Sequence, residues 1–312
     1  MRAFAVGSFG EAPAIHSLPI PHPDSALLIR VRYAGVNPID YKLLERLTAT
    51  SIYPFVMGID FAGVVEQVPT GECELRTGDR IFGMARTHGA YAEYTAVAPG
   101  AKTEPLARIP DGVTDEQAAA LPIPAITALG SLELLGVTAD QHLVVMGATG
   151  GVGGYAVQMA RSRGAHVIAT VRGDVDEARC LGAEEVYDTK AVDVIDALRA
   201  SHPDGVDAVL DLVNGSDAIR HDAEILKSGG RLVSTIYAAD EGWFAERQIT
   251  AYNIASSTNP LSSTQGLNEV AHMLAHGAIT ARIRSMVELG DAGQMLEKLR
   301  SGGLRGKAVI RL

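Results

Sequence analysis

The fold of this chain can be inferred from LVVMGATGGVGGYAVQMARSRGAHVIATV, residues 143–171. The first four residues, 143–146, are apolar, as expected of a short strand buried on both faces of a parallel sheet. From Val152 the apolar residues recur at helical spacing as far as Gly164, a residue type that often follows a helix. Residues 166–171 predict a second strand. The stretch therefore predicts a strand, a glycine-rich turn, a helix and a strand.

The turn between the first strand and the helix has the sequence G-A-T-G-G-V-G at residues 147–153. Small residues let a backbone approach a diphosphate, and a helix N-terminus offers free N–H groups and a positive dipole end. The pattern predicts a dinucleotide site, and a glycine-rich structural turn is the alternative. The residues expected to bind the cofactor here are Gly147, Thr149, Gly150, Gly151, Val152 and Gly153.

The end of the second strand indicates which dinucleotide is bound. NAD sites usually carry an acidic residue there, whereas the 2′-phosphate of NADP needs a cation and no carboxylate. This strand ends in Thr170 and Val171, and Arg172 follows. The sequence therefore favours NADP(H), with Arg172 and Thr170 on the phosphate. A surface arginine that pairs with Asp174 or Asp176 is the alternative.

Composition argues against several classes of function. The 312 residues carry a formal charge of −10 without a lysine- or arginine-rich stripe, which disfavours nucleic-acid binding. No apolar run is long enough to cross a membrane, and the first residues lack the apolar segment of a signal peptide. Cys73 and Cys180 give no disulfide framework. We therefore expect a cytoplasmic protein with no nucleic-acid or membrane partner.

The chain changes character along its length, which indicates two domains. The first part is rich in short strands, expected at residues 27–33, 63–68, 80–83 and 90–97. Thr114 and Gln117 then have the spacing of a capping box at the start of an alanine-rich helix. Further strands, separated by helices, are expected at residues 206–213, 230–236 and 249–255. The chain closes with a helix ending at Gly277, a helix at 292–299 and a strand at 307–312.

Further motifs occur in order along the chain. They are G-V-N-P-I-D at 35–40, G-I-D-F-A-G-V-V at 58–65, G-D-R-I-F-G at 78–83, G-A-Y-A-E at 89–93, L-P to T-A at 121–128 and G-K-A-V at 306–309. With the glycine turn, they resemble the zinc-free quinone oxidoreductase branch of the medium-chain dehydrogenase/reductase superfamily. The resemblance implies an α/β protein with a GroES-like β domain and a doubly wound parallel (Rossmann) domain. We place the catalytic domain at 1–118, the Rossmann NADP-binding domain at 119–256, and the return to the first domain at 257–312.

The resemblance also bears on metal binding. Zinc-dependent relatives hold their catalytic zinc with a thiolate, an imidazole and another ligand. By this resemblance Asn37 occupies the position of the cysteine and Ile59 that of the histidine. His272 and His276 are four residues apart on an expected helix, but no further ligand lies nearby in the sequence. We therefore expect no metal site.

The expected reaction follows from the cofactor and the missing metal. Without a Lewis acid, a quinone or an enone accepts hydride more readily than an unactivated ketone does. We therefore expect a zinc-independent, NADPH-dependent reduction of quinones or α,β-unsaturated carbonyl compounds. The alternatives are a non-catalytic NADPH-binding sensor or crystallin-like protein, and a pathway-specific enoyl reductase.

The catalytic candidates lie in residues 37–42. By resemblance to alkenal and enone reductases, Lys42 would contact the nicotinamide ribose or the substrate carbonyl, and Asn37 would help to hold the nicotinamide. Tyr41 is the nearest hydroxyl donor to the developing enolate. A solvated lysine, a turn-capping asparagine and a buried tyrosine are the alternatives. Asp60 stands where zinc-free relatives keep an acid, and we expect it to organise the floor of the cleft.

Other expected contacts rest on position. By the same resemblance, Thr127 would reach the nicotinamide or its ribose. Val213 and Asn214 end a core strand at its carboxyl edge, where doubly wound folds bind ligands, so both are expected to face the cofactor. Tyr237 and Trp243 are placed in a loop that either lines the substrate mouth or only packs.

The expected partners are a small quinone or enone substrate and a second copy of this chain. The family resemblance implies a homodimer. Pairing of the strand at 249–255 with its twin would remove an exposed sheet edge.

Overall fold

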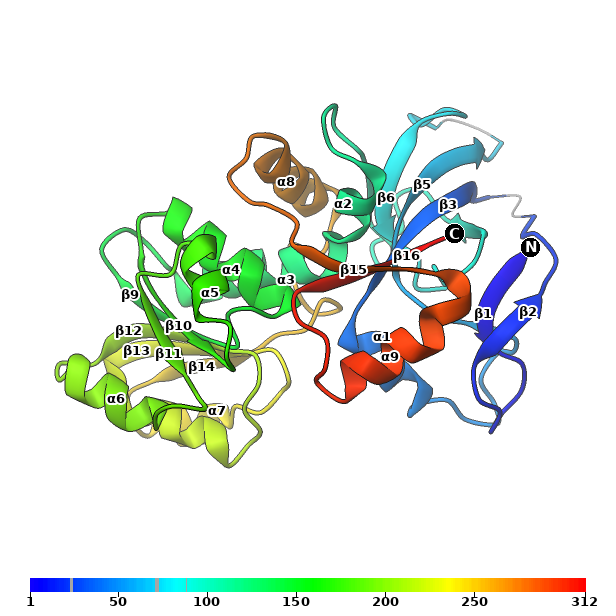
Figure 1. The fold of residues 1–312 in the computed structure, drawn as a ribbon. Helices are drawn as coiled ribbons and strands as arrows, with labels where there is room; N and C mark the ends of the chain where they lie inside the picture. Colours follow the sequence, from blue (N-terminus) through cyan, green and yellow to red (C-terminus); the bar gives the residue numbers. More distant parts are fainter. Residues whose placement is uncertain (23–24, 71–72, 88) are drawn as a thin grey trace. The chain divides into compact units, whose positions relative to one another are not determined.

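The computed structural model describes residues 1–22, 25–70, 73–87 and 89–312, which divide into two compact units (Figure 1). Unit 1 comprises Met1–Pro124, Leu261–Gly277 and Ala281–Leu312. Unit 2 comprises Ala125–Pro260 and Ala278–Thr280. The boundaries expected after residues 118 and 256 fall a few residues before the two main crossings of the chain between the units.

Unit 2 is built on a six-stranded sheet. Its strands are β9 (His142–Met146), β10 (His166–Val171), β11 (Glu185–Asp188), β12 (Val206–Asp211), β13 (Leu226–Ser234) and β14 (Thr250–Asn253). Their spatial order is β11-β10-β9-β12-β13-β14, and every neighbouring pair is parallel. Counted along the chain, this is the 3-2-1-4-5-6 order of a Rossmann fold. The predicted doubly wound sheet is therefore confirmed.

Helices cover both faces of this sheet. They are α3 (Pro122–Leu135), which begins in unit 1, α4 (Gly151–Ser162), α5 (Val175–Leu181), α6 (Val194–Ser201), the 3₁₀ helix η1 (Ala218–Glu224) and α7 (Glu241–Ala245). Figure 1 shows α4 and α5 over one face, and α6 and α7 over the other. Helix α4 begins one residue before the expected Val152 and buries Tyr155, Val157 and Met159. The strand–turn–helix–strand prediction for residues 143–171 is confirmed.

Three strands of unit 2 have ends that differ from the sequence prediction. β12 ends at Asp211, before Val213, because the Asp211 carboxylate accepts the backbone N–H groups of Val213 and Asn214 and closes a turn. β13 covers Leu226–Ser234 rather than residues 230–236, and β14 covers only Thr250–Asn253 of residues 249–255.

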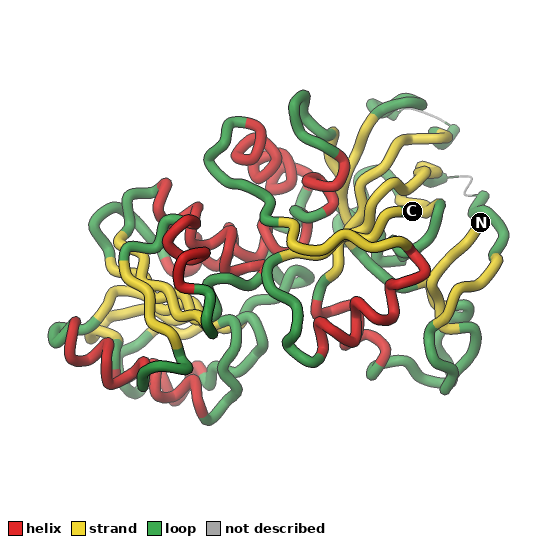
Figure 2. Tube along the Cα trace, in the orientation of Figure 1, coloured by secondary structure: helices red, strands yellow, loops and turns green. Residues whose placement is uncertain are grey.

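Unit 1 is rich in strands (Figure 2). They are β1 (Arg2–Val6), β2 (Ala14–Ser17), β3 (Leu27–Val36), β4 (Phe55–Val56), β5 (Asp60–Gln67), β6 (Arg80–Met84), β7 (Tyr94–Val97), β8 (Leu106–Arg108), β15 (Ile283–Glu288) and β16 (Lys307–Arg311). One sheet has the order β2-β1-β4. The other has the order β15-β16-β3-β5-β6-β8, with β7 also paired to β3. The last strand of the chain, β16, thus pairs with β3, near its beginning.

The helices of unit 1 are α1 (Pro38–Leu44), α2 (Asp115–Ala119), α8 (Thr264–Ala275), the 3₁₀ helix η2 (Leu289–Asp291) and α9 (Ala292–Arg300). The capping box of Thr114 and Gln117 is confirmed at the start of α2. Helix α1 is not predicted by the sequence analysis. It starts at a proline, and the Asp40 carboxylate caps it by accepting the backbone N–H of Asn37.

The predicted strand at residues 90–97 begins only at Tyr94. Ahead of it, Tyr91 donates its backbone N–H to the Met57 carbonyl, and Ala92 makes an isolated bridge to Ala3. These contacts hold the preceding residues to other parts of unit 1 and prevent a continuous strand.

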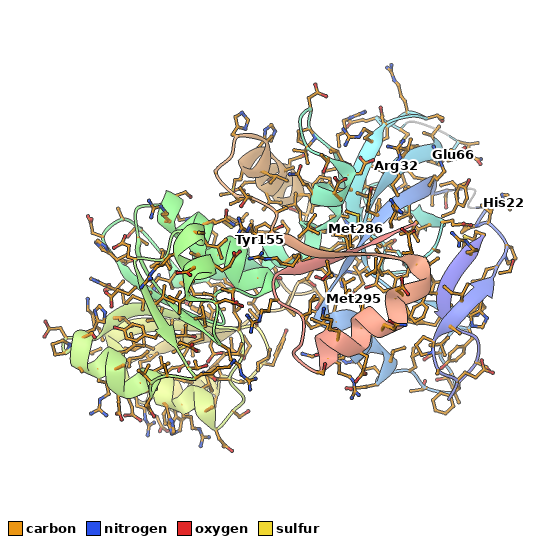
Figure 3. All side chains as sticks on the ribbon, in the orientation of Figure 1. His22, Arg32, Glu66, Tyr155, Met286 and Met295 are labelled. Atoms are coloured by element: carbon orange, nitrogen blue, oxygen red, sulfur yellow. The ribbon has the colours of Figure 1, made fainter. Side chains whose placement is uncertain are left out.

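Each unit has its own apolar core. Phe61, Ile81 and Met295 belong to the core of unit 1, where Met295 comes from α9. Figure 3 labels Met295 and Tyr155, whose side chains are both buried. Within the described residues, no helix combines the length and the apolar character that crossing a membrane would require.

Candidate functional site

The glycine turn in unit 2 requires glycine at two positions. Gly147 has a φ of +84°, and a Cβ on it would lie 2.7 Å from Cγ1 of Val213. A Cβ on Gly153 would lie 2.4 Å from the Gly147 carbonyl oxygen, closer than real side chains approach. Gly150 is the N-cap of α4 and has no side chain that could bond the first N–H groups of the helix. These groups therefore stay available to an anion such as a diphosphate.

The second strand supplies one buried hydroxyl and one exposed cation. Thr170 is buried, and its Oγ1 accepts the backbone N–H of Gly147 at 3.2 Å, so this hydroxyl holds the glycine turn. Arg172 follows β10 and is exposed. Within the described residues Arg172 forms no hydrogen bond or ion pair, and Asp176 pairs instead with Arg179 at 3.9 Å. Arg172 is thus free to bind an anionic group.

The turn after β12 lies beside the glycine turn. Asp211 Oδ1 accepts the N–H groups of Val213 and Asn214, each at 2.8 Å. The Val213 side chain is 58 % exposed and borders Gly147. The structure therefore brings together the carboxyl ends of β9, β10 and β12, which we call the glycine-turn edge. Its main residues are Gly147, Gly150, Gly153, Thr170, Arg172, Val213 and Asn214.

The other predicted cofactor residues of unit 2 have different settings. Thr149 lies in the glycine turn, and Gly151 and Val152 begin α4; all three are partly buried. Thr127 is buried in α3, where its carbonyl accepts the hydroxyl of Ser131 at 2.7 Å. Thr127 is therefore placed by α3 and not by the glycine-turn edge.

Unit 1 contains a buried polar cluster of five side chains: Asn37, Asp40, Asp60, Tyr91 and Lys307. All are at most 4 % exposed. Asn37 Nδ2 donates to Asp60 at 2.8 Å, and Asn37 Oδ1 accepts from Lys307 Nζ at 2.8 Å. Asp40 Oδ2 accepts from the Tyr91 hydroxyl at 2.8 Å. Both ends of the Asn37 amide are therefore occupied inside the unit, which fixes its orientation.

Backbone groups complete most of this polar cluster. Lys307 Nζ also donates to the Val36 carbonyl at 2.8 Å, and Asp60 accepts the N–H of Ile123 at 3.1 Å. Asp40 accepts the N–H of Asn37, but its Oδ1 has no hydrogen-bond partner among the described residues. The cluster thus ties the start of α1 to β5 and β16.

Burial dominates the protonation of the polar cluster. It raises the pKa of Asp40 to about 7 and that of Asp60 to about 6, against the opposing effect of their hydrogen bonds and of Lys307. Burial also lowers the pKa of Lys307, which the two carboxyl groups oppose. The carboxyl groups of the cluster therefore titrate near neutral pH rather than in acid.

The remaining candidates on α1 differ from Asn37. Tyr41 is partly buried and packs against the apolar core of unit 1. Lys42 lies in the last turn of α1, is partly exposed, and has no hydrogen bond or ion pair within the residues that the structure describes. Of the three predicted catalytic side chains, Tyr41 and Lys42 are both partly exposed and form no hydrogen bond among the described residues, whereas the Asn37 amide is fully engaged within unit 1.

The two positions that carry zinc ligands in zinc-dependent relatives are occupied here by Asn37 and Ile59. Asn37 belongs to the polar cluster, and Ile59 is buried with Met84 and Ile123. In the described part of the chain, no group of three or more His, Cys, Asp or Glu residues is arranged to hold a metal ion. His276 Nδ1 lies 2.8 Å from the His272 carbonyl oxygen, so this ring nitrogen is engaged with the helix backbone.

Three buried polar residues near these sites, Lys307, Tyr91 and Asp222, were not among the predicted site residues. Lys307 and Tyr91 were quoted only as parts of motifs, and Asp222 was not singled out. A polar residue in an otherwise apolar strand was an available signal for Lys307, in G-K-A-V. No local pattern marks Asp222, because its proximity to the Asp211 carboxyl group depends on the tertiary fold.

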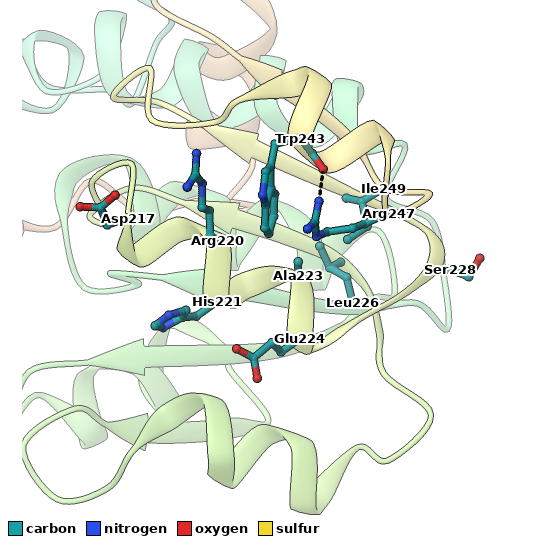
Figure 4. Close-up of a pocket in the computed structure, with 10 residues that line it drawn as sticks. All are labelled: Asp217, Arg220, His221, Ala223, Glu224, Leu226, Ser228, Trp243, Arg247 and Ile249. Carbon is teal, nitrogen blue, oxygen red and sulfur yellow. Dashed lines mark hydrogen bonds between the residues drawn. The ribbon is translucent and has the colours of Figure 1, made fainter.

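A pocket of about 720 Å³ lies at another place in unit 2 (Figure 4). Trp243 stands in it between two guanidinium groups, with that of Arg247 at 3.6 Å and that of Arg220 at 5.3 Å from the ring centroid. Leu226 and Ile249, at the starts of β13 and β14, also line it. Strand starts and strand ends of a parallel sheet lie at opposite edges, so this pocket is not part of the glycine-turn edge.

Trp243 was expected in a loop that either lines the substrate mouth or only packs; the loop assignment is wrong, and the structure agrees with packing. Trp243 is in helix α7 and packs against the core of unit 2. Tyr237 is in a loop, as expected, and is 56 % exposed. Its hydroxyl lies 3.3 Å from that of Thr258.

Comparisons with known proteins agree with this architecture. The alcohol dehydrogenase GroES-like domain matches residues 23–111, and the family described as zinc-binding dehydrogenase matches residues 181–310. The chain is 33 % identical over 242 residues to the quinone oxidoreductase of Rattus norvegicus, which covers 75 % of this chain and 72 % of that protein. The predicted combination of a GroES-like domain and a Rossmann domain is confirmed.

Solved structures are similar over the whole chain. The quinone oxidoreductase from Coxiella burnetii has a TM-score of 0.86 and 27 % identity, and the match covers 100 % of this chain and 99 % of that one. A mycobacterial protein complexed with NADPH has a TM-score of 0.86 and 25 % identity, with 100 % of both chains covered.

Proposed function

We propose that this chain, which belongs to the zinc-free quinone oxidoreductase branch of the medium-chain dehydrogenase/reductase superfamily, reduces quinones or α,β-unsaturated carbonyl compounds with NADPH and without zinc. The observation that carries this proposal is the glycine-turn edge, where open helix N–H groups and the free cation of Arg172 lie at the carboxyl ends of parallel strands. Relatives named quinone oxidoreductase and a similar structure complexed with NADPH support it.

The glycine-turn edge fits a dinucleotide phosphate. The absence of side chains at Gly147 and Gly153 lets the backbone close tightly, and the N–H groups at the start of α4 would bind the diphosphate. Arg172 would bind the 2′-phosphate, since β10 is not followed directly by a carboxylate that would repel it. Val213 would form an apolar wall beside the turn. NADPH supplies the hydride when it is bound.

In unit 1 the chemistry falls to Lys42 on α1. Hydride addition to an enone or quinone leaves negative charge on oxygen, and a positioned ammonium group can stabilise that charge without a metal. The polar cluster fixes the first turn of α1 through Asp40 and Asn37, and it thereby sets the direction in which Lys42 extends. We propose Lys42 as the group that binds the substrate carbonyl or the nicotinamide ribose.

The test is steady-state oxidation of NADPH and NADH by chelator-treated protein, with a small quinone and a small enone as acceptors. We expect faster turnover with NADPH and no loss of rate after metal removal. NADPH binding without turnover on either acceptor would favour a cofactor sensor. Rates that disappear with the chelator and return with zinc would contradict zinc independence.

A variant locates the chemistry within unit 1. Lys42→Ala should lower kcat/KM about tenfold, which corresponds to ~1.4 kcal/mol of transition-state stabilisation. Lys102→Ala, which removes an exposed lysine of the same unit, is the matched control and should leave the kinetics unchanged. Equal kinetics for the two variants would show that Lys42 is a solvated surface residue.

The assembly and the cellular setting belong to the same proposal. β14 is an edge strand of the sheet in unit 2, and pairing it with its twin would give a homodimer. Cys73 and Cys180 are both free, which accords with a reducing cytoplasm. We propose no nucleic-acid or membrane partner. Sedimentation at micromolar concentration tests the assembly, and a monomer would contradict it.

A further inference from the structure

Two carboxyl groups are buried beneath the turn after β12. Asp211 ends β12 and Asp222 lies in η1, and neither side chain is exposed. Asp211 Oδ1 accepts the N–H groups of Val213 and Asn214. Asp211 Oδ2 and both carboxyl oxygens of Asp222 have no hydrogen-bond partner within the described residues, if both groups are ionised. Of the four carboxyl oxygens of this pair, only Asp211 Oδ1 therefore accepts hydrogen bonds from the described residues.

One proton removes this conflict. Two adjacent buried carboxylates repel each other and lack solvation, so one of them takes up a proton. The O–H of Asp222 can then donate to Asp211, which leaves Asp211 as the anion that binds the two backbone N–H groups. Burial, the neighbouring charge of Asp211 and the hydrogen bond to it all raise the pKa of Asp222, to about 10. Asp222 is therefore the protonated partner at neutral pH.

We propose that Asp222 is a positioning residue of the cofactor site, because its proton, shared with Asp211, fixes the turn that carries Val213 and Asn214. Val213 borders the glycine turn directly, because its Cγ1 lies 2.7 Å from where a Cβ on Gly147 would be. A turn that moved would therefore change the wall of the glycine turn. The cofactor part of this inference rests on the proposed function, whereas the shared proton does not.

No other charged group of η1 neutralises the Asp222 carboxyl group in place of this proton. On η1, Arg220, His221 and Glu224 are exposed. Arg220 pairs with Asp240 at 3.9 Å, and Glu224 pairs at 3.1 Å with Arg199 from α6, which packs on η1. Of the described residues, Asp211 is the charged group that acts on Asp222.

Asp222→Asn tests the shared proton without any cofactor. Its amide N–H can donate to Asp211 as the acid does, but it cannot ionise. In the wild type the folded state keeps a proton that the unfolded state releases above about pH 4, so stability falls as pH rises from about 4 towards about 10. We therefore expect the Tm of Asp222→Asn, relative to the wild type, to rise steadily between about pH 5 and about pH 9.

Asp217→Asn is the matched control, because it removes an exposed acid from the same turn. It should follow the pH profile of the wild type. Parallel profiles for Asp222→Asn and the wild type would overturn the shared proton. So would a loss of Tm in Asp222→Asn as large as in Asp222→Leu, which leaves Asp211 with no donor from this position.

NADPH titrations then test the positioning role separately. We expect Asp222→Asn to retain the wild-type Kd and Asp222→Leu to weaken it about tenfold. If Asp222→Leu does not fold, Asp222→Asn still decides the shared proton. If the pH profiles diverge as expected but Asp222→Leu binds NADPH as the wild type does, the positioning role is wrong. Absence of NADPH binding to the wild type would contradict the proposed function and leave the shared proton standing.

Discussion

The glycine-turn edge of unit 2 and the polar cluster of unit 1 use polar groups in opposite ways. At the glycine-turn edge, the buried side chains of Thr170 and Asp211 accept backbone N–H groups of the turns. The exposed guanidinium group of Arg172 has no partner among the described residues. In the polar cluster, the buried side chains satisfy one another, as when Lys307 donates to Asn37. The first arrangement leaves backbone N–H groups and a cation open, where we propose that the cofactor binds, and the second fixes a helix. Mutations should therefore affect mainly binding in one region and mainly stability in the other.

The largest effect is expected at Lys307. Lys307→Met removes the donor to the Val36 carbonyl and to Asn37, and it removes the positive charge near Asp60. A buried acceptor left without its donor costs about 1–3 kcal/mol, so the loss of both hydrogen bonds should destabilise the protein by about 2–6 kcal/mol. Urea unfolding measures the change.

The control for Lys307 lies in the same strand. Arg311→Met removes an exposed cation that pairs with Glu288, and it should have little effect on stability. If Lys307→Met unfolds at the same urea concentration as the wild type, the polar cluster does not stabilise unit 1, and the contrast between the two regions fails.

The next effect concerns the glycine turn. Gly153→Ala would place its Cβ 2.4 Å from the Gly147 carbonyl oxygen, so the turn must shift. Such overpacking costs about 1–3 kcal/mol, and we expect NADPH affinity to fall about tenfold or more. In Gly154→Ala the new Cβ would lie 3.8 Å from Leu181, an ordinary contact, so affinity should be retained. Equal affinities for the two variants would show that the turn does not bind the cofactor.

A further effect concerns the pH dependence of stability that the protonation of Asp40 causes. The pKa of Asp40 is raised to about 7 in the folded protein, so stability is lost as pH rises from about 4 to about 7. The slope from this group is at most about 1.4 kcal/mol per pH unit. Asp40→Asn removes this slope, since its amide resembles the protonated acid. Urea unfolding between about pH 5 and about pH 8 measures it.

Asp111→Asn, at an exposed position of the same unit, is the control for this pH dependence and should keep the wild-type slope. An unchanged slope in Asp40→Asn would mean that Asp40 is ionised throughout this range, despite its burial.

The strand–turn–helix–strand unit of the glycine-turn edge was predictable because its signals are local. Apolar runs, helical spacing and glycines within residues 143–171 determine that strand–turn–helix–strand unit, and Arg172 follows it directly. The C-terminal end of β12 was less predictable, since the Asp211 carboxylate ends the strand by accepting the backbone N–H groups of Val213 and Asn214. That bond depends on a side-chain conformation that periodicity does not report.

The polar cluster could not be predicted in the same way. Asn37 and Lys307 are 270 residues apart in sequence, and Asp40 and Tyr91 are 51 apart. Their motifs were visible in the sequence, but pattern alone did not indicate that β16 would bring Lys307 to Asn37. Trp243 illustrates the same limit, since its aromatic character did not reveal that α7 packs it between Arg220 and Arg247.

The most direct test of the central claim is calorimetric titration of NADPH and NADH into the wild type and Arg172→Ala. A hydrogen bond between charged groups contributes about 1.5–3 kcal/mol, so the variant should lose roughly ten- to a hundredfold in NADPH affinity and little in NADH affinity. Arg179→Ala, at an exposed arginine of α5, should change neither. Equal losses for both dinucleotides, or no loss for NADPH, would contradict the assignment of the glycine-turn edge as an NADPH site.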